Sequence, residues 1–157
     1  IKLDKKNFQS LNGLGIVYAH LKNYEKAIEY YKKALSLDEE SSVVHNNLAN
    51  IYNNVNPNLA EKHYLKVLDL VSNDAMPYIN ISNYYLKNTK YKKCVQILEG
   101  ALDKDIKVKE LYNNLGIAYY ATKDNIRART MFEHAIKLDP NYTHALDNLK
   151  NINNLDK

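Results

Sequence analysis

Apolar and small residues return along this chain at a fixed spacing. In each copy Leu or Ile stands beside a small residue, Tyr follows three positions later, and a second apolar group begins about nine positions further on. Successive copies lie 34 residues apart, and once 33. A repeat of this length predicts stacked units rather than one globular core. The four copies are Leu14-Gly15-Tyr18-Ala27-Tyr31-Ala34, Leu48-Ala49-Tyr52-Ala60-Tyr64-Val67, Ile81-Ser82-Tyr85-Cys94-Leu98-Ala101 and Leu115-Gly116-Tyr119-Ala128-Phe132-Ala135.

Within each unit the apolar positions follow two helical faces. Counted from the first residue of a unit, positions 4, 7, 8 and 11 share one helix face, and positions 20, 24, 27, 28 and 30 share another. The sequence therefore predicts an antiparallel pair of helices in each unit and an all-α solenoid. Gly and Pro are scarce, with four and three residues, and this scarcity favours long helices over strands and turns. We expect the units at residues 8–41, 42–74, 75–108 and 109–142.

The small residues have a packing reason. A large side chain where two helices meet closely would overpack the interface and force the helices apart. We therefore expect close approaches at Gly15, Ala49, Ser82 and Gly116 on the first helices and at Ala27, Ala60, Cys94 and Ala128 on the second helices.

In this register the chain resembles the tetratricopeptide repeat (TPR) family. The family pattern has an aromatic at position 4, Leu-Gly at 7 and 8, Tyr at 11, Ala at 20 and 27, an aromatic at 24 and Pro at 32. The fourth repeat follows it down to Leu138-Asp139-Pro140-Asn141, whereas the other repeats lack this Pro. The resemblance implies a right-handed α-α superhelical solenoid whose concave groove is lined by the first helices. Position 4 departs from the family's Trp and carries Leu11, His45, Tyr78 and Tyr112.

Both ends of the chain repeat parts of a unit. Residues 1–7 copy the end of a second helix and the turn after it, and no Met begins the chain. We therefore expect a piece of a longer array. Residues 143–157 are predicted to form one more helix and a tail, and a capping helix or the first helix of a continuing array both fit.

Repeat 2 is one residue short between its two helices. At that place Asn56 and Pro57 are a favourable N-cap and first residue for the second helix. The shorter turn either changes the local helix angle, and with it the groove, or is simply tolerated.

Asn gathers on the positions that line the groove in the resembled family. Ten of the fifteen residues at positions 5, 6 and 9 are Asn, whereas a share of 22 Asn in 157 residues would place about two there. Helix propensity does not explain this placement, because Asn is a mediocre residue inside helices. The candidate peptide-binding residues are Asn46, Asn47, Asn50, Asn80, Asn83, Asn113, Asn114, Asn148 and Asn151; Asn12 completes the ten.

A primary amide can pair with both the N–H and the C=O of an extended peptide. The row at position 6 is similar to the asparagine ladder of O-linked N-acetylglucosamine transferases, and peroxisomal import receptors of the family use groove Asn residues in a related way. Repeat 1 departs by having Gly13 there. The same amides could instead bond within the array or face water. The ladder would consist of Asn47, Asn80, Asn114 and Asn148.

A second binding mode of the family is disfavoured by charge. Co-chaperones that hold an acidic C-terminal tail carry Lys at positions 5 and 2, Arg at position 6 and two Asn residues in successive repeats. Here all three cations are missing, and Glu110 has the wrong sign. We therefore do not expect a clamp for the acidic tails of chaperones. The residues compared are Asn46, Asn50, Asn80, Glu110 and Asn114.

Composition narrows the function classes further. The net charge is +4, Lys is spread along the helices, and Arg occurs only at positions 127 and 129. Nucleic-acid binders usually cluster these residues with stacking aromatics, so we expect no nucleic-acid partner. No apolar stretch approaches the length of about 18 residues that suggests a membrane span. One Cys fits a reducing compartment, and we expect a cytoplasmic or nuclear protein without a membrane partner.

The sequence has no catalytic or metal-binding signature. Cys94 occupies a small-residue packing site, and the five His residues are not spaced as metal ligands. His45 replaces the aromatic of position 4, and His20 lies at a groove position. No phosphate-binding loop or nucleophile motif is present. We therefore expect no cofactor, no metal and no catalytic residue in this chain.

These patterns predict a protein-protein interaction scaffold that holds an extended peptide or protein segment in its groove. Two alternatives stay open. The repeats could be the substrate-recognition arm of a larger enzyme, such as an O-GlcNAc transferase-like glycosyltransferase with its catalytic domain elsewhere. They could also belong to a structural subunit of a multiprotein complex.

Overall fold

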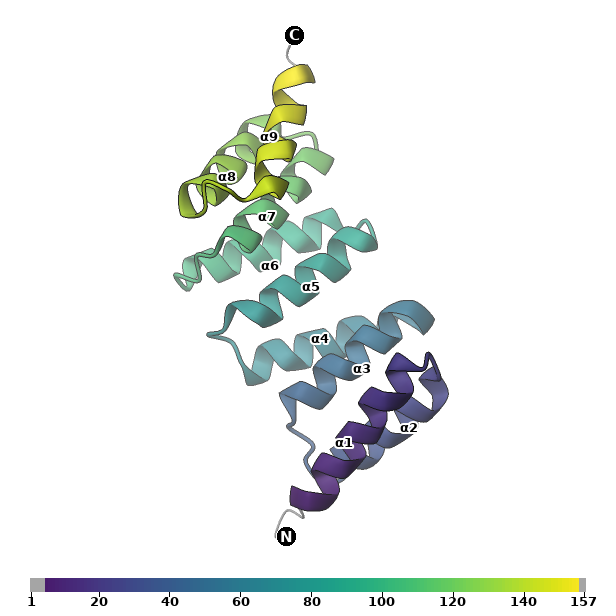
Figure 1. Cartoon of the computed structure of the whole chain (residues 1–157). Coiled ribbons are helices and arrows are strands. Elements are labelled where there is room, and N and C mark those ends of the chain that lie inside the picture. The colour runs from purple at the N-terminus through teal and green to yellow at the C-terminus, as the bar shows by residue number, and fades with distance from the viewer. Residues whose placement is uncertain (1–4, 156–157) are drawn as a thin grey trace. The chain divides into compact units, whose positions relative to one another are not determined.

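The computed structural model describes residues 5–155 of the 157-residue chain. All regular structure in these residues is helical, with nine α helices and no strand (Figure 1). The expected all-α helical repeat solenoid is thus confirmed. The chain divides into two compact units, Ile1–Ser72 and Asn73–Lys157, and each is described by itself.

The first unit consists of two helix pairs. α1 (Lys5–His20) pairs with α2 (Tyr24–Leu35), and α3 (Ser42–Val55) pairs with α4 (Pro57–Leu70). α3 also packs against α2 and α1, so that the second pair stacks on the first.

The second unit adds one helix to two such pairs. α5 (Ala75–Lys87) pairs with α6 (Tyr91–Asp103), and α7 (Lys109–Ala121) pairs with α8 (Asn125–Leu138). α7 packs against both α5 and α6. α9 (Thr143–Leu155) packs against α8 and α7, in the place that the first helix of a further pair would take.

Two glycines allow the helices of a pair to touch. A Cβ atom on Gly15 of α1 would lie 2.4 Å from Cε1 of Tyr31 on α2. A Cβ atom on Gly116 of α7 would lie 2.5 Å from Cε1 of Phe132 on α8. In both pairs the aromatic ring fills the space that a side chain would need. The other expected close approaches are also fully buried, at Ala27, Ala49, Ala60, Ser82, Cys94 and Ala128.

Three of the turns between paired helices share one geometry. Each has three residues, and the middle one has a positive φ of 57°, 56° or 66°. The next N–H donates to the carbonyl five residues earlier, as in a Schellman ending. The middle residues are Lys22, Thr89 and Lys123.

The short turn of repeat 2 replaces this geometry with a single residue. Asn56 follows the last residue of α3 and precedes Pro57, the first residue of α4. Its Oδ1 accepts a hydrogen bond from the N–H of Leu59 at 3.3 Å. The predicted N-cap and first residue are confirmed, and the residue with positive φ is missing from this turn.

The N-terminal boundary differs from the expectation. Residues 5–7 form the first turn of α1, not a turn before it. The reason is local, because Lys5 stands where repeat 4 has Pro140, and Lys is compatible with a helix. The expected end of a preceding helix at residues 1–4 and the last two residues of the tail lie outside the described residues.

Two glycine substitutions test the close approach. Gly116→Ala should lower the free energy of unfolding by about 1–3 kcal/mol, because the methyl group meets the Phe132 ring. Gly100→Ala is the matched control in α6, where an added Cβ meets nothing within 4 Å. It should raise stability by about 0.5–1 kcal/mol. Urea unfolding followed by circular dichroism measures both, and equal stability of the two variants would contradict the packing argument.

Candidate functional site

In the first unit the candidate asparagines lie along α3. Asn47 donates an Nδ2 hydrogen to Oδ1 of Asn12 on α1 at 3.3 Å. Asn50 is exposed, and its Oδ1 accepts the hydroxyl hydrogen of Tyr64 on α4 at 2.6 Å. Asn46 is half-buried. The amides of Asn47 and Asn50 therefore already link α3 to neighbouring helices.

In the second unit two candidate asparagines are buried. Asn114 is 7% exposed, and its Nδ2 donates to Oγ of Ser82 at 2.9 Å and to Oδ1 of Asn83 at 2.8 Å. Asn113 is 5% exposed and accepts from Nδ2 of Asn148 at 3.0 Å. Asn114 thus spends both amide hydrogens within the array, which was one of the two alternatives for these residues. A ligand contact by its carbonyl oxygen stays a prediction.

One amide bond occurs in both units at the same repeat positions. Asn47 bonds Asn12, and Asn148 bonds Asn113, so in each case the Asn at position 6 donates to the Asn at position 5 of the preceding repeat. The bond orients the donor amide. Because the amide group is planar, holding one N–H also fixes the direction of the second N–H and of the oxygen. An amide that is fixed before a ligand arrives loses less side-chain entropy on binding.

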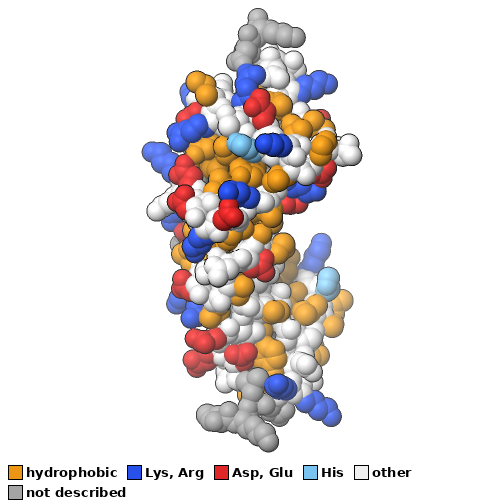
Figure 2. All heavy atoms as spheres, turned by 90° about the vertical axis from the view of Figure 1, so that its left-hand side faces the viewer, with side chains coloured by type: hydrophobic (Ala, Val, Ile, Leu, Met, Phe, Trp, Pro, Cys, Tyr) orange, Lys and Arg blue, Asp and Glu red, His pale blue; other side chains and the backbone are white. Residues whose placement is uncertain are grey.

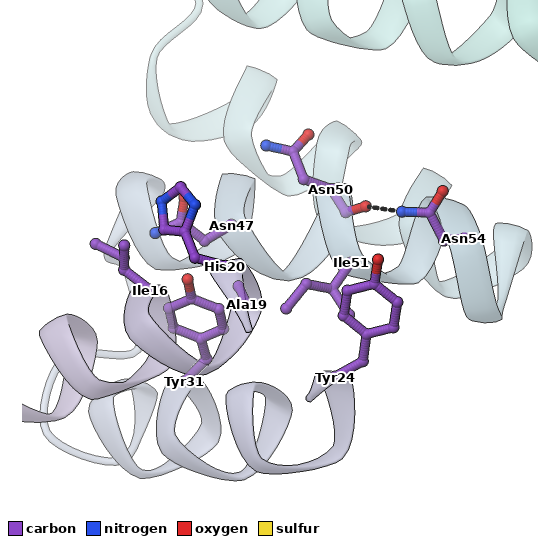
Figure 3. A pocket seen from close by; sticks show the side chains of 9 residues that line it. All are labelled: Ile16, Ala19, His20, Tyr24, Tyr31, Asn47, Asn50, Ile51 and Asn54. Carbon is purple, nitrogen blue, oxygen red and sulfur yellow. Dashed lines mark hydrogen bonds between the residues drawn. The ribbon is translucent and has the colours of Figure 1, made fainter. Parts of the chain in front are cut away.

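A hollow accompanies each of these bonds. The first, of about 280 Å³, lies between the two pairs of unit 1 (Figure 3). The second, of about 360 Å³, lies between α7, α8 and α9 of unit 2. Both are lined by positions 9, 12 and 24 of one repeat and by positions 6, 9 and 10 of the next. The matched residues are Ile16 and Ile117, Ala19 and Tyr120, Tyr31 and Phe132, Asn47 and Asn148, Asn50 and Asn151, and Ile51 and Ile152.

The lining of both hollows is apolar with an amide rim. In the first hollow the ring of Tyr31 and the side chains of Ile16 and Ile51 lie below Asn47 and Asn50 (Figure 3). His20, Tyr24 and Asn54 complete this lining, and the second hollow adds nothing outside the matched residues. Neither lining contains Lys, Arg, Asp or Glu. Such a surface suits an apolar side chain with an uncharged polar backbone beside it.

Sequence reasoning located part of this lining. Four of the nine candidate asparagines line the hollows: Asn47, Asn50, Asn148 and Asn151. The others, Asn46, Asn80, Asn83, Asn113 and Asn114, line neither of these two hollows. Sequence reasoning did not assign the aromatic of position 24 or the Ile of position 10 to the lining, because it treated both only as packing residues. Their recurrence in the pattern was the available signal, but a repeat pattern does not show which side of a packed ring faces a hollow.

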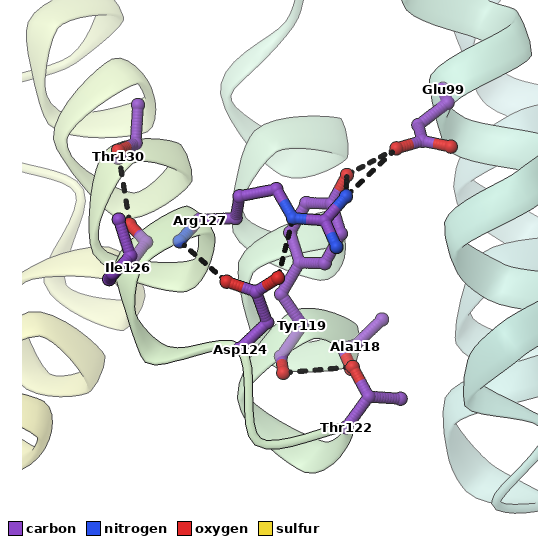
Figure 4. Close-up of polar contacts among 8 residues, drawn as sticks. All are labelled: Glu99, Ala118, Tyr119, Thr122, Asp124, Ile126, Arg127 and Thr130. Carbon is purple, nitrogen blue, oxygen red and sulfur yellow. Dashed lines mark hydrogen bonds and ion pairs between the residues drawn. The ribbon is translucent and has the colours of Figure 1, made fainter.

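The charged groups lie outside these hollows. On the part of unit 2 visible in Figure 2, basic and acidic side chains are interspersed with apolar ones. Arg127 shows how such a cation is engaged (Figure 4). Its guanidinium lies 4.3 Å from the ring centre of Tyr119, its Nε donates to Asp124 at 2.6 Å, and Glu99 lies 3.8 Å away. The pKa of Tyr119 is raised to about 12, mainly by burial and next by the hydrogen bond that the Tyr119 hydroxyl donates to Glu99.

Reactive groups are scarce among the described residues. Residues 5–155 contain no cluster of three or more His, Cys, Asp or Glu side chains that could hold a metal ion. Cys94 is fully buried against the Ser82 carbonyl, and burial raises the pKa of its thiol to about 12. None of the described helices has both the length and the apolar content to cross a bilayer.

Two of the four repeats match a known family. Models described as tetratricopeptide repeat match residues 8–41 and 109–142, which are the first and fourth units of the sequence pattern. The chain carries tetratricopeptide repeats. The resemblance inferred from the sequence is therefore confirmed, and the fold is one that generally serves as a protein-interaction scaffold.

Two curated proteins are similar to most of the chain. The type IV pilus assembly protein PilF of Pseudomonas aeruginosa is 28% identical over 131 residues, which are 82% of this chain and 52% of PilF. The mouse protein O-mannosyl-transferase TMTC3 is 24% identical over 165 residues, which are 95% of this chain and 18% of TMTC3. The chain therefore spans about half of the first relative and less than a fifth of the second.

Solved TPR structures have the same fold. Pseudomonas aeruginosa PilF superposes with a TM-score of 0.76 at 24% identity, over 94% of this chain and 68% of that one. YrrB, described as a TPR protein with an unusual peptide-binding site, gives 0.76 at 20% identity, over 94% and 76%. MamA of Desulfovibrio magneticus RS-1 gives 0.80 at 19% identity, over 96% and 85%. At such identities the likeness concerns the fold alone.

The buried Asn114 amide should matter for stability. Asn114→Ala removes two hydrogen bonds and leaves Ser82 and Asn83 without this donor, so it should lower the free energy of unfolding by about 1–3 kcal/mol. Asn151→Ala, at an exposed site on α9, should change it by less than about 0.5 kcal/mol. Chemical denaturation compares the two. Equal small effects would mean that the Asn114 bonds do not hold the repeats together.

The buried thiol predicts low reactivity. In the folded protein at neutral pH, Cys94 should react with a disulfide reagent far more slowly than in urea-unfolded protein, because it is inaccessible and stays protonated. Spectrophotometric thiol titration under both conditions measures the ratio. Similar rates in the two states would contradict the burial of this side chain.

Proposed function

We propose that each of the two hollows binds a segment of extended peptide and takes up one of its apolar side chains. The observation that carries this proposal is the recurrence of the same hollow, built from the same repeat positions, in both units. Packing alone requires close contact between repeats and gives no reason for an open, uncharged hollow at equivalent places.

The peptide backbone would pair with the amides at the rim. In each hollow the Asn at position 6 keeps one N–H and its oxygen outside the bond to the preceding repeat. A peptide group offers one acceptor and one donor, which these two atoms can match. Asn50 and Asn151, one helical turn further on, would reach the next peptide group.

The expected affinity is modest. Each such hydrogen bond contributes about 0.5–1.5 kcal/mol net, and each buried aliphatic or aromatic side chain adds about 1.5–3 kcal/mol. After the entropy cost of association, these contributions support dissociation constants of about a micromolar. Because neither lining contains Lys, Arg, Asp or Glu, the affinity should depend little on salt.

A second candidate function follows from the extent of the similarities. TMTC3 is similar over 95% of this chain, and this chain spans 18% of that enzyme. The repeats could therefore serve as the substrate-recognition arm of a larger enzyme, with the hollows holding the protein substrate. Both candidates use the same surface and differ in what adjoins it.

Peptide selection tests the proposal. A random peptide library displayed on phage and selected on the full chain should yield uncharged sequences with recurring apolar residues. Binding of a selected peptide, measured by calorimetry, should weaken about tenfold or more when Ile16→Ser, Asn47→Ala, Ile117→Ser and Asn148→Ala are combined.

The matched control carries two exposed substitutions on α8, Glu133→Ala and Lys137→Ala, which should leave binding unchanged. Affinity should vary less than about twofold between about 0.05 M and about 0.5 M salt. Selection of acidic peptides with strong salt dependence, or wild-type affinity in the folded quadruple variant, would refute the proposal.

A further inference from the structure

Two imidazole rings face each other between α3 and α4 of the first unit. Nδ1 of His45 and Nδ1 of His63 are 2.9 Å apart, and Nε2 of His45 lies 3.0 Å from the carbonyl oxygen of Glu39. His45 is 9% exposed, and the ring of His63 stacks on Tyr52 with 5.4 Å between centres. The pair thus joins the two helices of repeat 2 by a hydrogen bond between side chains 18 residues apart.

The partners determine where the protons are. A carbonyl oxygen can only accept, so Nε2 of His45 carries a hydrogen and donates it to Glu39. Neutral His45 then has a lone pair on Nδ1, and Nδ1 of His63 must carry the hydrogen between the rings. The remaining basic nitrogen of the pair is Nε2 of His63.

The number of protons that this arrangement can hold is limited. One added proton can reside on Nε2 of His63 and leaves a single hydrogen between the two Nδ1 atoms. A second added proton places an N–H on both Nδ1 atoms, which then face each other at hydrogen-bond distance and repel. The hydrogen bond between the rings therefore tolerates one positive charge at most. The neutral pair carries no electrostatic cost.

The surroundings disfavour even the first charge. Burial is the main cause that lowers the pKa of His63 to about 4, and His45, Lys62 and Lys32 add repulsion. These groups come from three helices: Lys32 from α2, Lys62 from α4 itself, and His45, together with the Tyr52 ring, from α3.

The pair lies next to residues of the first hollow. His63 precedes Tyr64, whose hydroxyl donates to Asn50 at the rim. His45 is two residues before Asn47, which bonds α1 and lines the same hollow. A separation of α3 from α4 at the imidazole pair would therefore disturb both rim amides.

We propose that the His45–His63 pair is a pH-sensitive clasp that holds α3 to α4 when neutral and loosens repeat 2 in acid. It acts on the helix pair itself, whether or not a peptide occupies the hollow. In the folded chain the pKa of His63 lies below its usual value of 6.5, so folding favours the neutral ring. The stabilisation is present above about pH 6.5 and is lost as the pH falls toward about 4.

Nuclear magnetic resonance of the full chain tests the protonation directly. Ring nitrogen shifts should show Nε2-protonated His45 and Nδ1-protonated His63 at neutral pH, with the His63 midpoint well below 6.5. A His63 midpoint at the ordinary value, or the opposite tautomers, would overturn the proposal. This measurement needs no variant and so does not depend on any variant folding.

Thermal unfolding tests the consequence. Between about pH 7 and about pH 4.5, the melting temperature of the full chain should fall by about 4 °C more in the wild type than in His63→Phe, whose ring can still stack on Tyr52 but takes up no proton. His144→Gln, at an exposed site on α9, should follow the wild type. Parallel curves for wild type and His63→Phe would show that the pair is no pH-sensitive clasp.

Discussion

The first and fourth repeats depend on one steric constraint, the absence of a side chain where the first helix meets the aromatic ring of its partner. At Gly15 and Gly116 the ring of position 24 occupies the volume that a Cβ would need. The same two rings, Tyr31 and Phe132, form part of the floor of the hollows. The constraint that allows the helices to pair thus also sets the depth and the apolar character of the candidate site.

The groove asparagines perform two tasks that compete for the same atoms. Asn114 uses both amide hydrogens to join α7 to α5, and its burial prevents any exchange of these bonds for water. Asn47 and Asn148 use one hydrogen for the array. The row at position 6 therefore contains one member whose two amide hydrogens are both bonded within the array, and two members that each donate one hydrogen to the preceding repeat.

Local rules explain what could be predicted from the sequence. The helix pairs and the cap at Asn56 follow from periodicity and from the preferences of single residues, which act over a few positions. The hydrogen bonds of Asn114 and the His45–His63 pair do not, because they depend on how helices far apart in sequence are rotated against each other. The helical start at Lys5 was missed because a repeat boundary was taken as a helix boundary.

The single-residue link in repeat 2 has a consequence for modular design. Three turns between paired helices contain a residue with positive φ, so repeats 1, 3 and 4 share an interchangeable joint. In repeat 2 Asn56 serves as the end of α3 and as the cap of α4. A chimaeric array could exchange repeats 1, 3 and 4 at their turns, whereas repeat 2 would have to be transferred whole, with both helices cut outside the pair.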